Sequence, residues 1–363
     1  MKILVINTVP TDKNGITNVI FNYLNAMGND VAFDYVAVNN PDVFYVNFLE
    51  EKGAALYSLK RKNVLGYIWS LCKIIKQNKY DAIHVHGNSH TVVLELLAAK
   101  LAGCKVRIIH AHSTGCNSVA LHKILTGLFD SLCTDRLACG EDAGKFMFAT
   151  KPFKIINNGV DVEKFLFDNN LRGALRTKLA LTDNDILVGH VGYFMPVKNQ
   201  SFLVDVFAEL ARNDSRYQLV LIGDGAMRAE IEQKVASLGL SNKVMFTGNI
   251  DNVSEYLNAI DIIVMPSLYE GLPLTLVEQQ ANGLQCVVSN TITAEADKTG
   301  NLCFLSLQAS ISDWVHAIEN SHCIQNRELR SKKAIVAIEK AGYSIRKEAK
   351  KIVEHYKCIC CSQ

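Results

Sequence analysis

The sequence predicts an α/β protein made of two doubly wound domains. Short apolar runs alternate with segments whose apolar residues recur at helical spacing, and this alternation is typical of parallel sheets covered by helices. The 363 residues are too many for one typical core and suit two domains. Hydrophobic residues make up 49% of the chain and charged residues 20%, as in a compact globular protein, and six prolines leave little room for disordered linkers.

The first half of the chain contains the first set of strands and helices. Its short apolar runs predict strands, and the segments between them have the apolar spacing of helices. Helices placed between short strands favour a parallel sheet with crossover connections. The predicted strands are 2–6, 31–38, 82–85 and 106–109, and the predicted helices are 16–27, 64–77 and 92–101.

The second half continues the alternation beyond a turn at Asn158-Gly159, where we place the inter-domain linker. A polar run, 168–185, separates the linker from the next strand, and 327–357 is predicted to form one long basic helix. The predicted strands are 186–191, 219–222, 244–246 and 261–265. We therefore expect an N-terminal domain at 1–165, a C-terminal domain at 166–340 and a terminal helix at 341–363.

Two glycines stand where a ligand could approach the backbone. Gly15 precedes the first predicted helix, and a glycine there allows close approach to the N-terminal N–H groups of that helix. Gly223 ends the strand 219–222 in a tight glycine turn before another helix, a position suited to a nucleotide.

The stretch 261–283 combines two acids with an anion-binding turn. After its strand we expect a helix opened by Gly271 and Pro273, because the fixed φ and missing N–H of proline suit a first turn. Glu270 lies in the loop at the carboxyl end of the strand, where open α/β sheets bind ligands and backbone N–H groups can receive a phosphate. Glu278 lies on the border of the packed helix face, where a carboxylate needs partners. An ordinary strand-loop-helix unit with an acid favoured by the helix dipole is the alternative. The packed face is marked by Leu274, Val277 and Ala281.

Two pairs of histidines lie at strand ends, His84 with His86 and His110 with His112. An imidazole at the carboxyl end of a strand is well placed to donate a hydrogen bond to a substrate, and a structural role is the alternative. We expect each pair to place one ring on each face of its strand. Neither pair would then chelate a metal through both rings, and no metal site is predicted.

The spacing Glu270-x7-Glu278, with Gly271-Leu272-Pro273 between the acids, resembles the E-x7-E motif of the retaining glycosyltransferases of family four. The resemblance implies the GT-B fold, in which two Rossmann-like domains face each other across a cleft. It also implies transfer of a sugar from a nucleotide donor to an acceptor, with the donor nucleotide held mainly by the second domain.

The resemblance extends along nearly the whole chain and is more specific in the second half. Residues 14–16 stand where the family has a glycine-rich turn, and 154–165 resemble its inter-domain signature, in which Asn-Gly-Val-Asp precedes an aromatic residue. Lys198-Asn199 matches the lysine of its diphosphate motif, and 286–295 resembles a subset that builds bacterial capsular and exopolysaccharides.

The resemblance implies roles for individual residues. Glu270 would face the donor sugar, Lys198 would neutralise charge on the departing diphosphate, and His110 would lie near the transferred sugar, which makes these three the candidate catalytic residues. Glu278 would accept hydrogen bonds from the ribose hydroxyls. The candidate substrate-binding residues are Gly15, His112, Tyr193, Gly223, Asn249, Ile250, Gly271, Leu272, Pro273, Leu274 and Glu278.

Tyr193 departs from the family pattern, which has an arginine at this position. A phenol can hydrogen-bond an oxyanion but brings no charge, so the departure removes a bidentate phosphate clamp. Either the donor is held with less cationic help, or a nearby arginine compensates, or activity is reduced.

We therefore expect a retaining, metal-independent hexosyltransferase. It would transfer a hexose or N-acetylhexosamine from a nucleotide-sugar, a UDP-sugar by preference, to a lipid-linked or oligosaccharide acceptor in bacterial capsular or exopolysaccharide biosynthesis. The nucleotide-sugar is a substrate, so no cofactor is expected, and the strand-end Asp-x-Asp motif that would coordinate a divalent ion is missing. The alternatives are a sugar-nucleotide epimerase of the same architecture and a non-catalytic sugar-nucleotide-binding protein.

Charge restricts the partners. Residues 1–160 carry 17 Lys and Arg against 12 Asp and Glu, whereas the remainder carries 21 against 24. A basic half suits a nucleic acid, an anionic membrane or an anionic acceptor, and no nucleic-acid motif occurs. The basic segment 60–79 with Trp69 could lie on a membrane surface, with a solvated helix face as the alternative.

The chain is expected in the cytoplasm, with possible peripheral association at the inner face of the membrane. No apolar run approaches 18 residues, and the first residues form a strand and a polar loop instead of a signal peptide. The eleven cysteines are then expected to stay reduced, with Cys358, Cys360 and Cys361 in a frayed tail.

Overall fold

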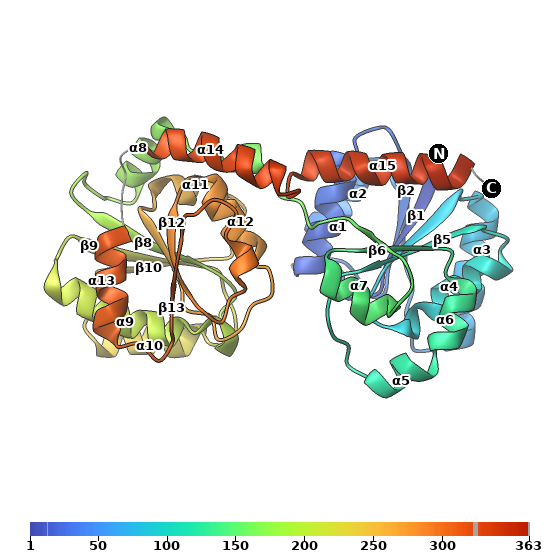
Figure 1. Ribbon diagram of the computed structural model, residues 1–363, viewed down its shortest axis with the longest axis horizontal. Helices are drawn as coiled ribbons and strands as arrows, with labels where there is room; N and C mark the ends of the chain where they lie inside the picture. Colours follow the sequence, from blue (N-terminus) through green and yellow to red (C-terminus); the bar gives the residue numbers. More distant parts are fainter. Residues whose placement is uncertain (13, 322–325, 362–363) are drawn as a thin grey trace. The chain divides into compact units, whose positions relative to one another are not determined.

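The computed structural model describes residues 1–12, 14–321 and 326–361, and it divides into two compact units (Figure 1). Unit 1 comprises Met1–Gly159 together with the chain from Ile345 onward, and unit 2 comprises Val160–Ser344. Both are α/β units built on parallel sheets, which confirms the predicted fold class.

Unit 1 contains a seven-stranded parallel sheet in the order β3-β2-β1-β4-β5-β6-β7. The strands are β1 Lys2–Asn7, β2 Ala32–Ala37, β3 Leu56–Ser58, β4 Ala82–His86, β5 Val106–Ala111, β6 Asp135–Ala138 and β7 Lys154–Ile155. The helices are α1 Gly15–Ala26, α2 Val43–Glu51, α3 Val64–Asn78, η1 His90–Val92, α4 Val93–Leu101, α5 Val119–Ile124, α6 Thr126–Leu132, α7 Glu141–Phe148 and α15 Ile345–Cys361.

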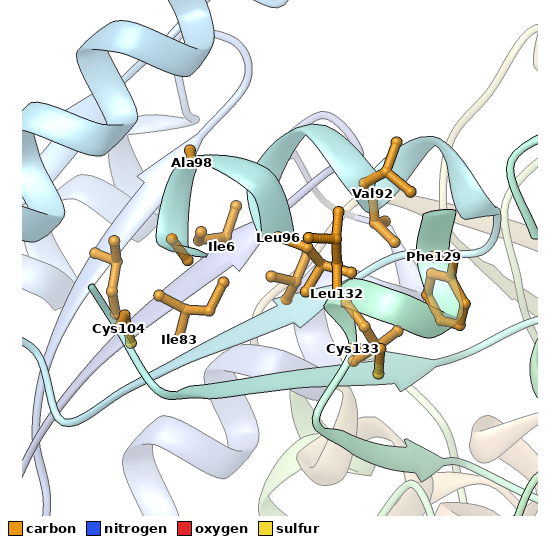
Figure 2. Packing of buried hydrophobic residues seen from close by; sticks show 14 of the residues in the cluster. Ile6, Ile83, Val92, Leu96, Ala98, Cys104, Phe129, Leu132 and Cys133 are labelled. Carbon is orange, nitrogen blue, oxygen red and sulfur yellow. The ribbon is translucent and has the colours of Figure 1, made fainter. Parts of the chain in front are cut away.

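The core of unit 1 lies between its sheet and the helices that cover it. Figure 2 shows Leu96 of α4 and Leu132 of α6 pointing toward the strands that carry Ile6 and Ile83. In a parallel sheet of this kind, helices cover both faces, so the side chains on both faces of each strand are apolar. This explains why the strands read as continuous apolar runs in the sequence.

Unit 2 repeats the plan with six parallel strands in the order β10-β9-β8-β11-β12-β13. The strands are β8 Ile186–Val191, β9 Tyr217–Ile222, β10 Val244–Gly248, β11 Ile262–Met265, β12 Gln285–Ser289 and β13 Leu302–Leu305. The helices are η2 Val162–Phe165, α8 Asn169–Lys178, η3 Pro196–Lys198, α9 Gln200–Asn213, α10 Arg228–Ser237, α11 Val253–Ala259, α12 Leu274–Ala281, η4 Ala294–Ala296, α13 Ile311–Ser321 and α14 Arg327–Lys340.

The strand order reverses once in each sheet, between β1 and β4 in unit 1 and between β8 and β11 in unit 2. At such a switch point the connections on its two sides run in opposite directions, and open α/β sheets bind their ligands there, outside the carboxyl ends of the strands. The loops after β8 and β11 therefore share one edge of unit 2, and the ends of β1, β4 and β5 share one edge of unit 1.

The polar run 168–185 is more structured than predicted, because it contains the helix α8. Two of its arginines are buried and reach Asp261, with nitrogen–oxygen distances of 2.5 Å for Arg172 and 3.1 Å for Arg176. The backbone N–H of Leu187 also donates to Asp261, at 2.7 Å. The polar composition hid a helix in which two arginines point inward, because both are paired with Asp261.

The single long helix predicted for 327–357 was wrong. The chain forms α14 in unit 2 and α15 in unit 1, and the break falls at Gly342, whose φ of +86° is left-handed and suits glycine. The frayed cysteine tail was also wrong, because α15 continues to Cys361. All ten cysteines in the described part of the chain are free thiols.

Within the described ranges, no helix combines the length and apolar character that a membrane span requires.

Candidate functional site

The loops after β8 and β11 are joined at the switch point of unit 2. The backbone N–H of Leu268 donates to the carbonyl of Val197 at 2.7 Å, and the side-chain amide of Asn199 donates to the carbonyl of Pro266 at 3.1 Å. Asn199 also adopts a left-handed backbone, with φ of +55°, between η3 and α9. These contacts bring together two predicted residues that lie 72 positions apart, Lys198 and Glu270.

Lys198 and Glu270 form an ion pair at this edge. The Lys198 ammonium donates to Oε1 of Glu270, and the hydroxyl of Ser267 donates to the same oxygen at 3.2 Å. Each side chain of the pair is 16% exposed, so both groups are largely sheltered but still open to solvent. An anionic ligand at this edge could take the place of the Glu270 carboxylate beside the ammonium.

The loops after β8 and β9 approach so closely that glycine is required. At Gly223, with φ of +135°, a Cβ would lie 2.2 Å from the carbonyl oxygen of Gly192. At Gly225, with φ of +156°, it would lie 2.4 Å from the carbonyl oxygen of Phe194. Gly223 is therefore required by the close backbone packing between the loops after β8 and β9.

The loop after β10 completes the edge. The N–H of Gly223 donates to the carbonyl of Gly248 at 3.0 Å, which places Asn249 and Ile250 directly beyond this junction. Asn249 is exposed, whereas Ile250 is partly buried against the core of unit 2. Of the two predicted contacts, Asn249 has the freer side chain.

Arg228 is a cation at this edge that the sequence analysis missed. Its guanidinium pairs with Asp224 at 3.3 Å and Glu232 at 2.7 Å, and its Nη1 would lie 3.3 Å from a Cβ on Gly248. The available signal was an arginine opening the helix that follows the glycine turn. It is a candidate for the nearby arginine that compensates for Tyr193.

The helix α12 begins later than predicted. Its first residue is Leu274, and Pro273 occupies the N-cap position instead of the first turn. Gly271 is exposed, Leu272 and Leu274 are partly buried, and no atom lies within 4 Å of a Cβ placed on Gly271. The loop between Glu270 and α12 is therefore open at Gly271, whereas Pro273 is buried.

Glu278 lies on α12 and is only partly exposed. Burial raises the pKa of its carboxyl to about 7, and the nearby ammonium of Lys164 acts in the opposite direction. The carboxylate is thus poised for a partner that would hydrogen-bond its charged form.

His190 is a second group that the sequence analysis missed. It is fully buried on β8, and its Nδ1 is 2.9 Å from the carbonyl oxygen of Val264. That contact places the proton on Nδ1, so Nε2 is an acceptor that lies 3.2 Å from the position of a Cβ on Gly192, beside the Lys198 side chain. Burial lowers the pKa of His190 to about 4, with the charge of Lys198 as a further cause. Like the predicted histidines of unit 1, it sits near the carboxyl end of an apolar strand.

Tyr193 is 56% exposed, and its carbonyl accepts a hydrogen bond from the Gln200 amide at 3.1 Å. The backbone is therefore fixed while the phenol extends toward solvent. No buried pocket has formed around the ring.

The histidine pairs of unit 1 do not divide between the faces of their strands, so that expectation was wrong. The ring centroids of His84 and His86 lie 4.2 Å apart, and those of His110 and His112 lie 4.3 Å apart. Adjacent residues of a strand alternate between its faces, so residues two apart share a face. Because β4 and β5 are neighbours, with His86 opposite His110, all four rings gather on one side of the sheet.

His110 is completely buried, and His112 is partly exposed. Burial lowers the pKa of both imidazoles, that of His112 to about 4. The Nε2 atom of His112 lies against His86, and its Nδ1 is buried, so the exposed part of the residue is not a ring nitrogen.

Gly15 is the exposed first residue of α1, which Asn14 caps through the Thr17 N–H at 3.0 Å. No atom lies within 4 Å of a Cβ placed on Gly15. The described residues of unit 1 therefore do not require a glycine there.

Comparison with known proteins shows that the sequence of this chain is similar to those of glycosyltransferases. The family described as Glycosyl transferases group 1 matches residues 172–320, which lie in unit 2. A putative glycosyltransferase of Bacillus subtilis (strain 168), EpsF, is 32% identical over 85% of this chain and 84% of its own length.

A second relative and a solved structure extend the comparison. The UDP-Gal:alpha-D-GlcNAc-diphosphoundecaprenol alpha-1,3-galactosyltransferase of Escherichia coli is 35% identical over 61% of this chain and 60% of its own length. The crystal structure of Anabaena Alr3699/HepE in complex with UDP has a TM-score of 0.80, with 18% identity over 99% of this chain and all of that chain. The latter supports the likeness in fold.

Proposed function

Because the chain belongs to the group 1 glycosyltransferases, we propose that it transfers a hexose or N-acetylhexosamine from a UDP-sugar to a lipid-linked or oligosaccharide acceptor. The E. coli relative is named for a UDP-galactose donor and a diphosphoundecaprenol-linked acceptor, and the Anabaena structure holds UDP. The process would be bacterial capsular or exopolysaccharide biosynthesis, in keeping with the resemblance of residues 286–295.

The observation that carries the proposal is the Lys198–Glu270 pair at the switch point of unit 2. A donor diphosphate would accept hydrogen bonds from the Lys198 ammonium and release Glu270, whose carboxylate would turn to the donor sugar. In the transition state the charge on the leaving diphosphate grows, so the ammonium would stabilise it more than it stabilises the ground state.

Glu278 would bind the ribose. A carboxylate can accept two hydrogen bonds from a cis-diol, and such bonds favour its charged form. The carboxyl has a pKa of about 7 in the free protein, so its charged form is not strongly favoured there. The ribose hydroxyls of a bound nucleotide would supply hydrogen bonds that favour this charged form.

Retention of the anomeric configuration and independence of a divalent ion belong to the same proposal. In this proposal, Lys198 supplies the positive charge that a metal ion supplies in other transferases. The sequence has no strand-end Asp-x-Asp motif that would hold a divalent ion against the diphosphate. In unit 1, the acceptor would meet His112, with His110 behind it in the buried row of rings.

Peripheral membrane association is proposed through the basic face of unit 1. Trp69 is 67% exposed on α3, and the ammonium of Lys73 lies 5.4 Å from its ring centroid. An exposed aromatic beside lysines suits an interface with anionic lipid headgroups.

The proposal is tested by incubating the purified protein with UDP-galactose, UDP-glucose and their N-acetyl analogues, with and without a diphosphoundecaprenol-linked sugar. We expect UDP release that depends on the lipid-linked acceptor and a product whose anomeric configuration, determined by NMR, matches the donor. Conversion of one UDP-sugar into another without acceptor would instead identify an epimerase. Tight donor binding with neither transfer nor hydrolysis would identify a binding protein and overturn the proposal.

A further inference from the structure

The strongest feature outside the proposed donor site is the row of histidines at the carboxyl ends of β4 and β5 in unit 1. His84, His86 and His110 are buried, and each offers a ring nitrogen such that the three nitrogens lie within 4.8 Å of one another. The rings come from two neighbouring strands, so a backbone that is already hydrogen-bonded holds them together.

We propose that His84, His86 and His110 form a binding site for one transition-metal ion of the zinc class. Zinc takes three imidazoles in a tetrahedral site that leaves a fourth position for water. Imidazole nitrogens suit Zn²⁺, Co²⁺, Ni²⁺ and Cu²⁺, whereas Mg²⁺ and Ca²⁺ require oxygen ligands, which this set does not offer.

The hydrogen bonds of the rings engage one nitrogen of His84 and one of His86. Nδ1 of His84 contacts the hydroxyl of Tyr356 on α15, and Nδ1 of His86 lies 2.8 Å from Nε2 of His112. Histidines that bind metals usually donate their second ring N–H to such a partner, which fixes the tautomer and turns the other nitrogen to the metal. In both rings this other nitrogen is Nε2.

His110 has the strongest need of a ligand. Among the described residues, neither of its ring nitrogens has a hydrogen-bond partner, and Nε2 of His84 is also buried without one. Buried polar atoms without partners are costly, and a metal ion would satisfy two of these nitrogens at once.

All three rings are buried, so the protein shields the site from bulk water. The ion would tie β4 to β5 and, through Tyr356, support the contact with α15. We assign it no step in sugar transfer, and the site stands whether or not the proposed reaction is correct.

The test is titration of the chelator-treated protein with Zn²⁺ by calorimetry and with Co²⁺ by absorption spectroscopy. We expect one ion per chain, an absorption spectrum without thiolate-to-cobalt bands, and no binding of Mg²⁺ at the same concentration. His110→Leu should weaken Zn²⁺ binding at least a hundredfold. His122→Leu is the matched control, because this buried histidine of unit 1 stacks on His90 outside the row and should leave binding unchanged.

The cysteines near the end of α15 are the main competitor for a soft metal. The triple variant Cys358→Ser/Cys360→Ser/Cys361→Ser should therefore bind Zn²⁺ as the natural chain does. If His110→Leu does not fold, X-ray absorption of the zinc-loaded natural chain decides, with three imidazole nitrogens expected at zinc. Sulfur ligands at zinc, loss of binding in the triple variant, or binding at no fixed stoichiometry would each overturn the proposal.

Discussion

The two units share one topology and differ in the chemistry at the carboxyl edges of their sheets. In unit 1, β4 and β5 end in four stacked imidazoles whose pKa values are lowered by burial, so the edge is polar but uncharged at neutral pH. In unit 2, β8 and β11 lead to a lysine and a glutamate that pair with each other. The same scaffold therefore presents a neutral nitrogen-rich edge in one unit and a charged edge in the other.

This difference matches the ligands that we propose for the two edges. A diphosphate carries concentrated negative charge, so its site needs cations that the fold holds in position. These cations must not be locked into ion pairs that the diphosphate cannot replace. Lys198 meets this requirement because its ion-pair partner, Glu270, is itself proposed to turn to the donor sugar. Sugar hydroxyls are bound by neutral hydrogen-bond donors and acceptors, and a transition-metal ion is bound by neutral nitrogen ligands. Imidazoles supply both.

The contrast extends into the cores and yields the largest expected effect. In unit 2, Asp261 is buried between Arg172 and Arg176, so Asp261→Asn would leave two guanidinium groups without their counter-charge. Loss of one partner of a buried ion pair costs about 3–5 kcal/mol. We expect that loss in the free energy of unfolding of unit 2, measured by urea denaturation followed by hydrogen exchange resolved by segment.

Glu95→Gln is the matched variant in unit 1. Glu95 is buried against Arg61 and the hydroxyl of Tyr67, but burial raises the pKa of its carboxyl, so the fold already disfavours the charge. The Arg61 side chain is also 25% exposed and can turn to water. A cost of about 1–2 kcal/mol is expected. Equal losses in the two variants would show that the cores do not differ in this way.

Lys198→Ala tests the charged edge directly. If the ammonium acts chiefly on the departing diphosphate, kcat should fall about a hundredfold while the donor Kd changes much less. Steady-state kinetics with calorimetry of UDP separates the two quantities. Lys234→Ala is the control, since Lys234 pairs with Asp205 at 2.6 Å in the same unit and should leave both quantities unchanged. Because Lys198→Ala also leaves Glu270 unpaired, Lys198→Ala/Glu270→Gln shows whether a stray carboxylate causes the defect.

Glu278 provides a pH signature that belongs to unit 2. Its folded-state pKa of about 7 exceeds the ordinary value of 4.5, so its contribution to stability is present below about pH 4.5 and is lost as the pH rises through 7. The free energy of unfolding of the free protein should therefore fall across this window, by at most about 3 kcal/mol. Glu278→Gln should remove this part of the pH dependence in thermal unfolding measured from pH 5 to 8.

Nucleotide binding should show the opposite trend with pH. If the carboxylate accepts hydrogen bonds from the ribose, UDP binds the charged form better, and affinity rises as the pH passes through 7. Glu278→Ala should weaken UDP binding by about 1–3 kcal/mol at pH 8. Calorimetry at several pH values measures this, and unchanged affinity in a folded variant would remove Glu278 from the donor site.

The sequence was sufficient for the parts of the molecule that follow a local rule. Apolar runs located eight of the thirteen described strands, namely β1, β2, β4 and β5 in unit 1 and β8, β9, β10 and β11 in unit 2. The spacing of Glu270 and Glu278 drew attention to the loop after β11. The structure brings Glu270 and Lys198 together, but the roles of Glu270, Glu278 and Lys198 in binding and catalysis stay predictions.

What the sequence did not yield depends on pairings between distant segments. The helix α8 went unnoticed because its buried arginines find Asp261 only in the folded chain, and a polar run alone predicts no such partner. The gathering of four imidazoles requires β4 and β5 to be neighbours, and it was further obscured by an error in assigning residues two apart to opposite faces. Arg228 and His190 became visible only once the loops after β8, β9 and β10 were placed side by side.

The smallest expected effect concerns Tyr193, where the charged edge of unit 2 lacks a charge that the family pattern includes. If an arginine here clamps the diphosphate in relatives, Tyr193→Arg should add a second cation beside Lys198. Charge-assisted hydrogen bonds are worth about 1.5–3 kcal/mol, and an exposed position retains only part of that, so a gain of about tenfold in UDP affinity is expected.

The structure favours this outcome over a steric failure. The phenol is 56% exposed, so a longer side chain meets solvent and displaces no packed neighbour. Arg228 is the competing cation, because if it already serves the diphosphate, a further arginine would add repulsion and affinity would stay flat or fall. The Kd of UDP and of GDP for the natural chain, Tyr193→Arg, and Tyr193→Arg combined with Arg228→Ala, all at one ionic strength, separates these cases. A tenfold gain in the single variant would show that this edge had room for one more charge. A loss that Arg228→Ala reverses would mean that Arg228 had already taken the place of the missing clamp.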